Sequence, residues 1–261
     1  MKIGYATAAA ILVVGCNVDR DGGTNVRPEP RERPTVQQKT AARPPARSGV
    51  DPSRLVLVEG RARLDVETGF LKIPGEIRND TGQWITSACV AVRLFDAAGK
   101  EISTSSIATA VSEDLGREPG EFVYADRTFI PPGEVGVFMF MRDVKKIHGT
   151  YASHKLSVTA RPAEGAPVVA LRGLATPKDG DGQLGARGHI DNTGAIGCRS
   201  PKAVLGLYAA DGKLIATTTA QPDETFQKML APRKSIAFAI ASVGEPGVAN
   251  VKAWADCEPV D

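Results

Sequence analysis

The feature that most limits the fold of this chain is an internal repeat with a constant spacing. The stretch GEIRNDTG begins at Gly75, and the related stretch GHIDNTG begins at Gly188. Leu94 and Leu207 are separated by the same interval, within VAVRLFDAAGKEI and AVLGLYAADGKLI. Repetition at a fixed spacing indicates two copies of one structural unit, so we expect two similar domains in tandem.

The pattern inside each copy is that of β-strands. Apolar and polar residues alternate over residues 71–77 and 90–94 in the first copy, and over residues 203–207 in the second. A period of two with one apolar face predicts strands that are covered on one side. DAAGKEI and AADGKLI carry the glycine of a tight turn between two such strands. We therefore predict an all-β chain in which each copy is a two-sheet sandwich.

These landmarks resemble the FxLyD domain, a small immunoglobulin-like β-sandwich of bacterial and archaeal envelope proteins. The naming motif reads VRLFD at residues 92–96 and LGLYA at residues 205–209. The Pro-Gly before an F-containing strand is kept at residues 132–133 and becomes Pro-Arg at residues 232–233. The resemblance implies two tandem immunoglobulin-like domains, and it carries over no catalytic residue because none is known in that family. We place the two domains at residues 51–163 and 164–261.

The first copy carries an extra segment. The stretch between the turn glycine and the later proline is longer in the first copy than in the second, and most of the excess lies in or near residues 112–126. Loops on a rigid scaffold often carry binding residues, and aromatic side chains are common anchors. The alternative is that the aromatic part of the segment forms an added edge strand. The candidate binding residues of this loop are Leu115, Phe122 and Tyr124.

Residues 1–16, MKIGYATAAAILVVGC, have the features of an export signal. Their apolar run is too short to span a hydrocarbon core, which needs about 20 residues, and Lys2 supplies a positive start. The ending V-V-G-C resembles the lipobox of bacterial lipoproteins, in which the cysteine thiol takes a diacylglyceryl group and cleavage falls before it. The resemblance implies a signal peptide over residues 1–15 and a lipidated Cys16; a plain signal or a short membrane anchor is the alternative.

Lipidation at Cys16 would make the bilayer a partner of this protein, because several acyl chains together give stable anchoring. In the lipoprotein family an Asp after the cysteine tends to retain the protein in the inner membrane of bacteria with two membranes. This chain has Asn17. The resemblance therefore favours the outer membrane over the inner membrane, within a bacterial cell envelope.

Residues 16–50 differ in composition from the rest of the chain. They are rich in proline and arginine and contain no aromatic residue. Such a segment cannot bury enough apolar surface to offset the entropy of ordering, so we expect a disordered tether. Its mixed charges favour a solvated spacer, and its mild basic excess leaves open a contact with anionic lipid or polymer.

The chain contains four cysteines, of which Cys16 is assigned to lipidation. Cys198 and Cys257 both lie in the second copy, and an exported protein meets an oxidising space. Because each copy should fold as a unit, we expect a disulfide between these two residues. Cys89 then remains, either as a small residue near a strand end or as a thiol for an intermolecular bond.

Charge and motifs argue against several classes of function. Lys and Arg number 32 and Asp and Glu number 30, a balance that gives no nucleic-acid footprint. Neither H-E-x-x-H nor G-x-S-x-G occurs. The G-x-G-x-x-G within DGDGQLG at residues 179–185 precedes a predicted strand rather than the helix that a dinucleotide site needs. We therefore expect no catalytic residue, no metal site and no cofactor.

Three functions are compatible with these features. The first is a non-catalytic envelope module that binds a protein, a peptide or an envelope polymer through loops or sheet edges. The second is a structural spacer or an assembly subunit of an envelope complex. The third is a hydrolase whose site no motif reveals. The absence of a nucleophile–base constellation in the sequence favours the first.

Overall fold

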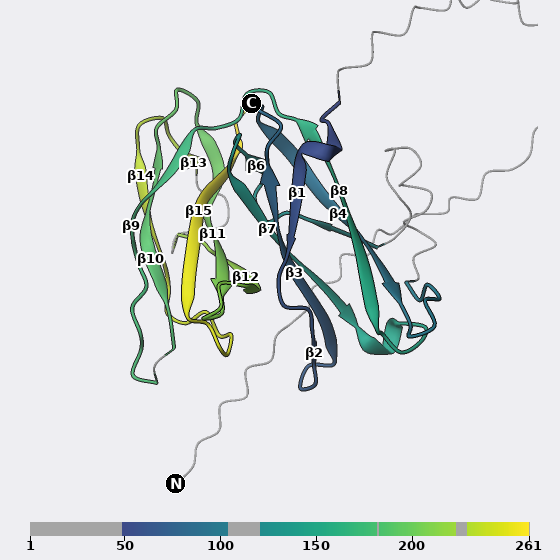
Figure 1. Cartoon of the computed structure of the whole chain (residues 1–261). Helices are drawn as coiled ribbons and strands as arrows, with labels where there is room; N and C mark the ends of the chain where they lie inside the picture. Colours follow the sequence, from purple (N-terminus) through teal and green to yellow (C-terminus); the bar gives the residue numbers. More distant parts are fainter. Residues whose placement is uncertain (1–48, 104–120, 182, 223–228, 261) are drawn as a thin grey trace, which may run out of the picture. The chain divides into compact units, whose positions relative to one another are not determined.

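The computed structural model describes residues 49–103, 121–181, 183–222 and 229–260. Within these residues the chain forms fifteen strands and two 3-10 helices, and no α-helix is found there (Figure 1). The predicted all-β fold class is therefore confirmed. Strands up to residue 162 pair with one another, strands from residue 169 onward pair with one another, and each set makes two antiparallel sheets.

The first sandwich is built around two long central strands. In one sheet β3 (Phe70–Asn79) pairs with β7 (Val135–Asp143) along one side, and with β1 (Leu55–Glu59) and β2 (Arg63–Asp65) along the other. In the other sheet β4 (Ile85–Phe95) pairs with β8 (Ser153–Pro162) on one side, and with β5 (Glu121–Tyr124) and β6 (Phe129–Ile130) on the other. A 3-10 helix, η1 (Pro52–Arg54), precedes β1, and a second, η2 (Val144–Lys146), follows β7.

The second sandwich has the same plan. Its first sheet places β10 (Ala186–Asn192) between β9 (Val169–Ala175) and β14 (Ser235–Ile240). Its second sheet has β11 (Cys198–Tyr208) at the centre, with β15 (Asn250–Pro259) on one side and β12 (Leu214–Ala220) and β13 (Met229–Leu230) on the other. Thus β10 corresponds to β3, β11 to β4 and β15 to β8.

The repeat extends to a backbone irregularity in each central strand. Ser87 in β4 and Ser200 in β11 stand at equivalent positions of the two copies, and their φ angles are 51° and 54°. Ser87 lies at the point where the register between β4 and β8 shifts, and Ser200 lies where the register between β11 and β15 shifts. A residue with positive φ inside a register shift is typical of a β-bulge, which bends a strand and increases its twist. The two copies therefore share a strand deformation as well as a topology.

Each sandwich buries a core between its two sheets. The apolar residues predicted to face the core in β3 and β4 are confirmed as buried, at 0–1% exposed; in β4, Cys89 and Ala91 on the opposite face are buried as well. The prediction that such strands are covered on one side is wrong for β11. Val204 and Tyr208, on its second face, are as fully buried as Leu205 and Leu207 on its first. The reason is that the second face of β11 packs against the first sandwich.

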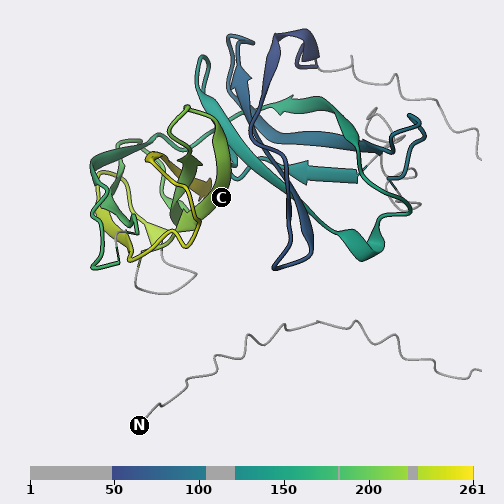
Figure 2. The ribbon, with the colours of Figure 1, turned by 60° about the horizontal axis from the view of Figure 1, so that its bottom comes forward.

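An apolar cluster joins the two sandwiches. Val137 of β7 packs with Val204, Tyr208 and Leu214 of the second sandwich, and Trp254 contacts the same cluster. Figure 2 shows the second sandwich beside the β7 side of the first. The described residues of both sandwiches accordingly belong to one compact unit. The contact buries apolar side chains of both sandwiches, which makes it part of the folded body rather than a loose junction.

Polar contacts border this apolar cluster. The Tyr208 hydroxyl donates a hydrogen bond to the carboxylate of Glu76, and burial together with that carboxylate raises the pKa of Tyr208. The Arg61 guanidinium lies 2.6 Å from a carboxylate oxygen of Asp211, and the Arg61 amide donates to the Leu214 carbonyl at 2.8 Å. These bonds fix one orientation of the two sandwiches, because directional contacts at a border select among the arrangements that an apolar patch alone would allow.

Candidate binding site

A pocket lies where loops of the first sandwich meet two strands of the second. Its volume is about 410 Å³, within the range of about 300–1,000 Å³ that is usual for small-ligand sites. Both tryptophans of the chain, Trp84 and Trp254, line it, and both are half-buried. The remaining wall consists mainly of residues 167–171 and 253–257 of the second sandwich.

The two tryptophans are positioned by different means. Trp84 directly precedes β4 and ends the turn after β3. That turn is held by Asn79, whose side-chain amide donates to the carbonyls of Gln83 and Ile130 at 2.8 and 2.9 Å. Trp254 lies within β15, paired with Val204. Trp254 lies on the sheet face that meets the first sandwich. The main chain at both tryptophans is therefore held by hydrogen bonds, in a strand for Trp254 and in a turn for Trp84.

Two strand edges form part of the pocket wall. One is formed by residues 167–171, which lead into β9 and contain its first residues. The other is formed by residues 253–257 of β15. Every residue of both stretches lines the pocket. Side chains of a strand point alternately to opposite faces, so a consecutive run lines one pocket only when the strand presents its edge. The pocket therefore offers main-chain groups as well as side chains.

A buried carboxylate closes one side of the pocket. Asp256 is 2% exposed, and one of its oxygens accepts hydrogen bonds from the amide and the hydroxyl of Thr128, both at 2.9 Å. The same oxygen lies 3.4 Å from Nζ of Lys202. A buried carboxylate is tolerated only when charged or polar partners compensate it, and here the partners come from both sandwiches.

A second carboxylate lies next to this pair. Burial is the main cause that raises the pKa of Asp126, and the charge of Asp256 raises it further. The Thr217 side chain and the charge of Lys202 act in the opposite direction. One oxygen of Asp126 is buried without a hydrogen-bond partner among the described residues. Burial thus outweighs the stabilising contacts of the ionised Asp126, which explains the direction of the pKa shift.

A buried guanidinium supplies the positive charge of the pocket. Arg127 is 6% exposed, and its Nη1 donates to a carboxylate oxygen of Glu134 and to the Val135 carbonyl, each at 2.8 Å. Its Nε is buried and has no hydrogen-bond partner in the part of the chain that the structure describes. A buried donor without a partner reduces the stability of the fold, so this part of the pocket wall carries a cost.

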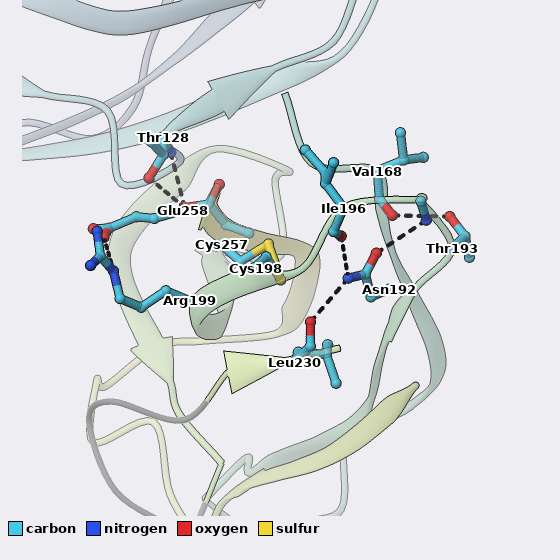
Figure 3. The surroundings of a disulfide bond; sticks show 12 residues. Thr128, Val168, Asn192, Thr193, Ile196, Cys198, Arg199, Leu230, Cys257 and Glu258 are labelled. Atoms are coloured by element: carbon cyan, nitrogen blue, oxygen red, sulfur yellow. Dashed lines mark hydrogen bonds and ion pairs between the residues drawn. A yellow bond between two sulfur atoms is a disulfide. The ribbon is translucent and has the colours of Figure 1, made fainter. Parts of the chain in front are cut away.

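The cysteine pair expected from the sequence is bonded in the structure. The disulfide links Cys198 of β11 to Cys257 of β15, with Cα atoms 5.8 Å apart (Figure 3). It therefore joins neighbouring strands of one sheet at the floor of the pocket, which Cys257 lines. Cys89 is buried in β4 and takes no part in this bond. Cys16 lies outside the described residues.

The loop proposed from the extra segment is only partly a loop. Phe122 and Tyr124 lie in β5, a short strand at the edge of its sheet, paired with Ala91 and Cys89 of β4. For these two residues the alternative of an edge strand is confirmed, because their main chain continues the antiparallel ladder on β4. They line none of the pocket described above. Leu115 lies outside the described residues.

The structure shows where the extra residues enter the first copy. Ile102 is equivalent to Ile215. Val123 is equivalent to Ala220, because the two residues pair with equivalent positions of β4 and β11. In the second copy one uninterrupted strand, β12, joins these two positions. The residues between them are 216–219 in the second copy, and the much longer stretch 103–122 in the first. The extra segment therefore interrupts an edge strand.

The pocket residues were missed by the sequence analysis, although a signal exists. Gly197 stands at the position of the second copy that is equivalent to Trp84. Trp254 pairs with Val204, and Ser157 pairs with Ala91, the residue equivalent to Val204. Trp254 and Ser157 therefore hold equivalent positions. Each tryptophan thus replaces a small residue of the other copy. Large side chains that break an internal repeat mark positions with a role beyond the shared fold.

Other sequence features have local explanations. The glycine-rich residues 179–185 include a turn in which the Asp179 carboxylate accepts hydrogen bonds from two following amides, and β10 follows it. Among the described residues, no group of three or more His, Cys, Asp or Glu is placed to hold a metal ion. In that same part of the chain, no helix has the length and apolarity needed to cross a membrane.

Comparison with known proteins adds little to this description. No protein-family model matches the sequence, and a search of curated proteins gives no match. Among solved structures the chain is similar to red sea bream transglutaminase, with 10% sequence identity, a TM-score of 0.24, and coverage of 78% of this chain and 29% of that one. The chain thus spans under a third of the transglutaminase length, and a score this low supports no argument about function.

Proposed function

We propose that this chain is a non-catalytic binding module of a bacterial cell envelope, anchored to the outer membrane through an acylated Cys16. The lipobox-like ending V-V-G-C supports the anchor. The two sandwiches are compatible with tandem immunoglobulin-like domains of the FxLyD kind, which are found in envelope proteins. In this arrangement the body that binds is residues 51–261, and the residues before it connect it to the lipid.

The observation that carries the proposal is the pocket lined by Trp84 and Trp254. It combines aromatic walls with a small number of fixed polar groups, which is the usual composition of a ligand site. Both rings are about half-buried, so each keeps exposed apolar surface that a bound molecule would cover. We expect the bound molecule to be a protein segment, a peptide or an envelope polymer.

The pocket chemistry supports binding rather than catalysis. Among the described residues that line it there is no His, Ser, Thr or Lys, and the one cysteine of this lining is held in the disulfide. Asp256 is compensated by Thr128 and Lys202, so that it orients neighbouring groups and is not placed to activate a nucleophile. A hydrolase needs a nucleophile with a base in hydrogen-bond reach, and the described lining supplies no such pair.

Tryptophan emission gives a direct test, because the only two tryptophans of the chain line the pocket. The full chain with Cys16→Ser is titrated with size-fractionated, solubilised envelope material. We expect one fraction to change the emission saturably, and Trp84→Phe and Trp254→Phe each to weaken its binding by about tenfold, the loss of one aromatic anchor. Leu64→Ala, at an exposed site in β2, should bind normally. Emission unchanged by every fraction would contradict the proposal.

The anchor is tested separately. Cells that express the wild-type chain and the Cys16→Ser variant are grown with radioactive palmitate. The wild-type chain should be labelled and should fractionate with the outer membrane, and the variant should carry no label. Label that persists in the variant would remove the lipoprotein assignment and leave the pocket proposal untouched.

A structural role as spacer or assembly subunit is the second candidate. The observation in its favour is the set of polar contacts that fix the two sandwiches, such as Arg61 with Asp211 and Tyr208 with Glu76. A rigid two-domain body is suited to holding a partner at a set position. This role predicts a stable stoichiometric partner whose binding survives both tryptophan substitutions, which the titration above distinguishes.

A further inference from the structure

The pocket contains an open strand edge. Strand β9 is the last strand of its sheet, and within the described part of the chain it pairs with β10 alone. Its first residues, together with Pro167 and Val168, line the pocket as a consecutive run. An open strand edge exposes a row of main-chain donors and acceptors to whatever enters the pocket.

The hydrogen-bond pattern shows which of these groups face the pocket. The Thr193 amide donates to the Val168 carbonyl at 2.9 Å, so the main-chain groups of Val168 point toward β10. The Asn192 amide instead donates to the Lys234 carbonyl, so the groups of Asn192 point away from β9. Asn192 is the register partner of Val169. In an antiparallel pair the direction alternates with each residue, so the N–H and C=O of Val169 and Leu171 point to the open edge.

We propose that the pocket takes an extended peptide segment, which adds as a strand to the β9 edge and lays its side chains against Trp84 and Trp254. This inference rests on the proposed binding function and deepens it by naming the class of ligand. Val169 and Leu171 are alternate residues of one strand, and each contributes one donor and one acceptor at the spacing of an extended chain. A rigid polysaccharide has no matching alternation of donors and acceptors.

The side chains of the pocket support the same class of ligand. The cavity of about 410 Å³ accommodates a few residues rather than a folded domain. The lining carries two carboxylates, Asp256 and Glu134, against the single guanidinium of Arg127. We therefore expect peptides with aromatic, proline or aliphatic side chains and few acidic ones.

The experiment uses the full chain with Cys16→Ser and a library of hexapeptides that are acetylated and amidated at their ends. Peptides are selected on the immobilised chain, and the best one is titrated by tryptophan emission. N-methylation of that peptide at single positions should weaken binding about tenfold at alternate residues and leave the intervening residues near wild type, because only alternate amides of an added strand face β9. Equal effects at every position, or at none, would overturn strand addition.

Two matched variants test the strand edge itself. Leu171 and Leu57 hold the same register position in the two sandwiches, opposite Ile190 and Ile77, and Leu57 lines none of the pocket. Leu171→Pro removes an N–H at the open edge and should lower affinity for the selected peptide by about tenfold or more, whereas Leu57→Pro should leave it within about twofold. Equal affinities in the two variants would overturn the proposal.

The possible failures are distinguishable. Peptide-free glycan chains prepared from the cell wall are titrated in parallel. If they change the emission saturably and no hexapeptide does, the binding function stands and the peptide inference is wrong. If neither probe changes the emission, both proposals fall. If Leu171→Pro does not fold, the N-methyl series on the wild-type chain still decides the matter.

Discussion

Asn79 and Asn192 occupy equivalent positions in the two copies and make the same hydrogen bonds. They are 0% and 1% exposed. The Asn79 side-chain amide donates to the carbonyls of Gln83 and Ile130, and that of Asn192 donates to those of Ile196 and Leu230 (Figure 3). Each asparagine thus ties the turn after one central strand to the other sheet of its sandwich.

The first prediction concerns these asparagines. Asn79→Ala and Asn192→Ala should each destabilise the protein by about 2–4 kcal/mol, since each leaves two buried carbonyls without their donor. Asn79→Ala should in addition displace Trp84, which follows the turn that Asn79 holds, and shift the tryptophan emission. Asn192→Ala is the matched control for stability. Urea unfolding measures the stability of both variants, and a loss of stability below about 1 kcal/mol in either variant would contradict the argument.

The second prediction concerns Gly60, where the main chains of the two sandwiches lie close together. A Cβ at residue 60 would lie 2.4 Å from the Leu214 carbonyl oxygen and 3.0 Å from that of Pro74. Main-chain atoms cannot yield as a flexible side chain does, so Gly60→Ala should cost about 1–3 kcal/mol by forcing the sandwiches apart. Gly180→Ala, where no atom lies within 4 Å, is the control and should be near neutral. Thermal unfolding of both variants makes the comparison.

The third prediction uses two equivalent turns. Gly133 and Arg233 precede β7 and β14, and their φ angles are 78° and 61°. The left-handed conformation costs an L-residue about 1–2 kcal/mol and costs glycine nothing, although glycine loses more entropy on folding. Arg233→Gly should therefore stabilise the protein by up to about 1 kcal/mol, and Gly133→Arg should destabilise it. Urea midpoints that move in the same direction for both would contradict this explanation.

The fourth prediction is a dependence of stability on pH. Burial raises the pKa of Asp126 above its usual 3.8 in the folded protein, so the folded state binds a proton more tightly than the unfolded state. The contribution of this group to stability is full below pH 3.8 and is lost as the pH rises through the raised pKa. Asp126→Asn, which is neutral throughout, should match the wild type near pH 3 and exceed its stability at pH 7 by on the order of 1 kcal/mol.

A series of urea titrations between pH 3 and pH 7 tests this directly. If Asp126→Asn is instead less stable than the wild type at pH 7, the contacts of the ionised carboxylate with Thr217 and Lys202 outweigh its burial. That result would reverse the sign of the prediction.

The fifth prediction concerns the disulfide. Cys198 and Cys257 are 59 residues apart in sequence, and closing a loop of this length contributes about 4 kcal/mol on the chain-entropy model. The double variant with Cys198→Ser and Cys257→Ser should lose stability of this order. It should also bind more weakly at the pocket, because Cys257 is part of its wall. A non-reducing peptide map of the protein should contain the Cys198–Cys257 peptide; a map that links Cys89 to either residue would contradict this prediction.

Much of the fold could be predicted because its signals are local. Alternation of apolar and polar residues depends only on the two-residue period of a strand, so residues such as Ile73 and Val92 could be placed on a buried face from sequence. The repeat identified the two copies, because identical landmarks at one spacing require no knowledge of contacts. The cysteine pair followed from assigning both residues to one copy.

Tertiary structure alone decided the features that depend on contacts between distant residues. The second face of β11 looks half-polar in sequence, with Lys202, Val204 and Gly206, yet it is largely covered because the first sandwich packs against it. The edge strand β5 reads as part of an insertion because its ladder partner, β4, is too distant in sequence for a local pattern to reveal. Trp84 and Trp254 come from opposite copies of the repeat and meet in one pocket, which no local pattern reveals either. The sequence determines which strand faces are apolar and are stabilised by burial, and only the tertiary structure determines which residues cover them.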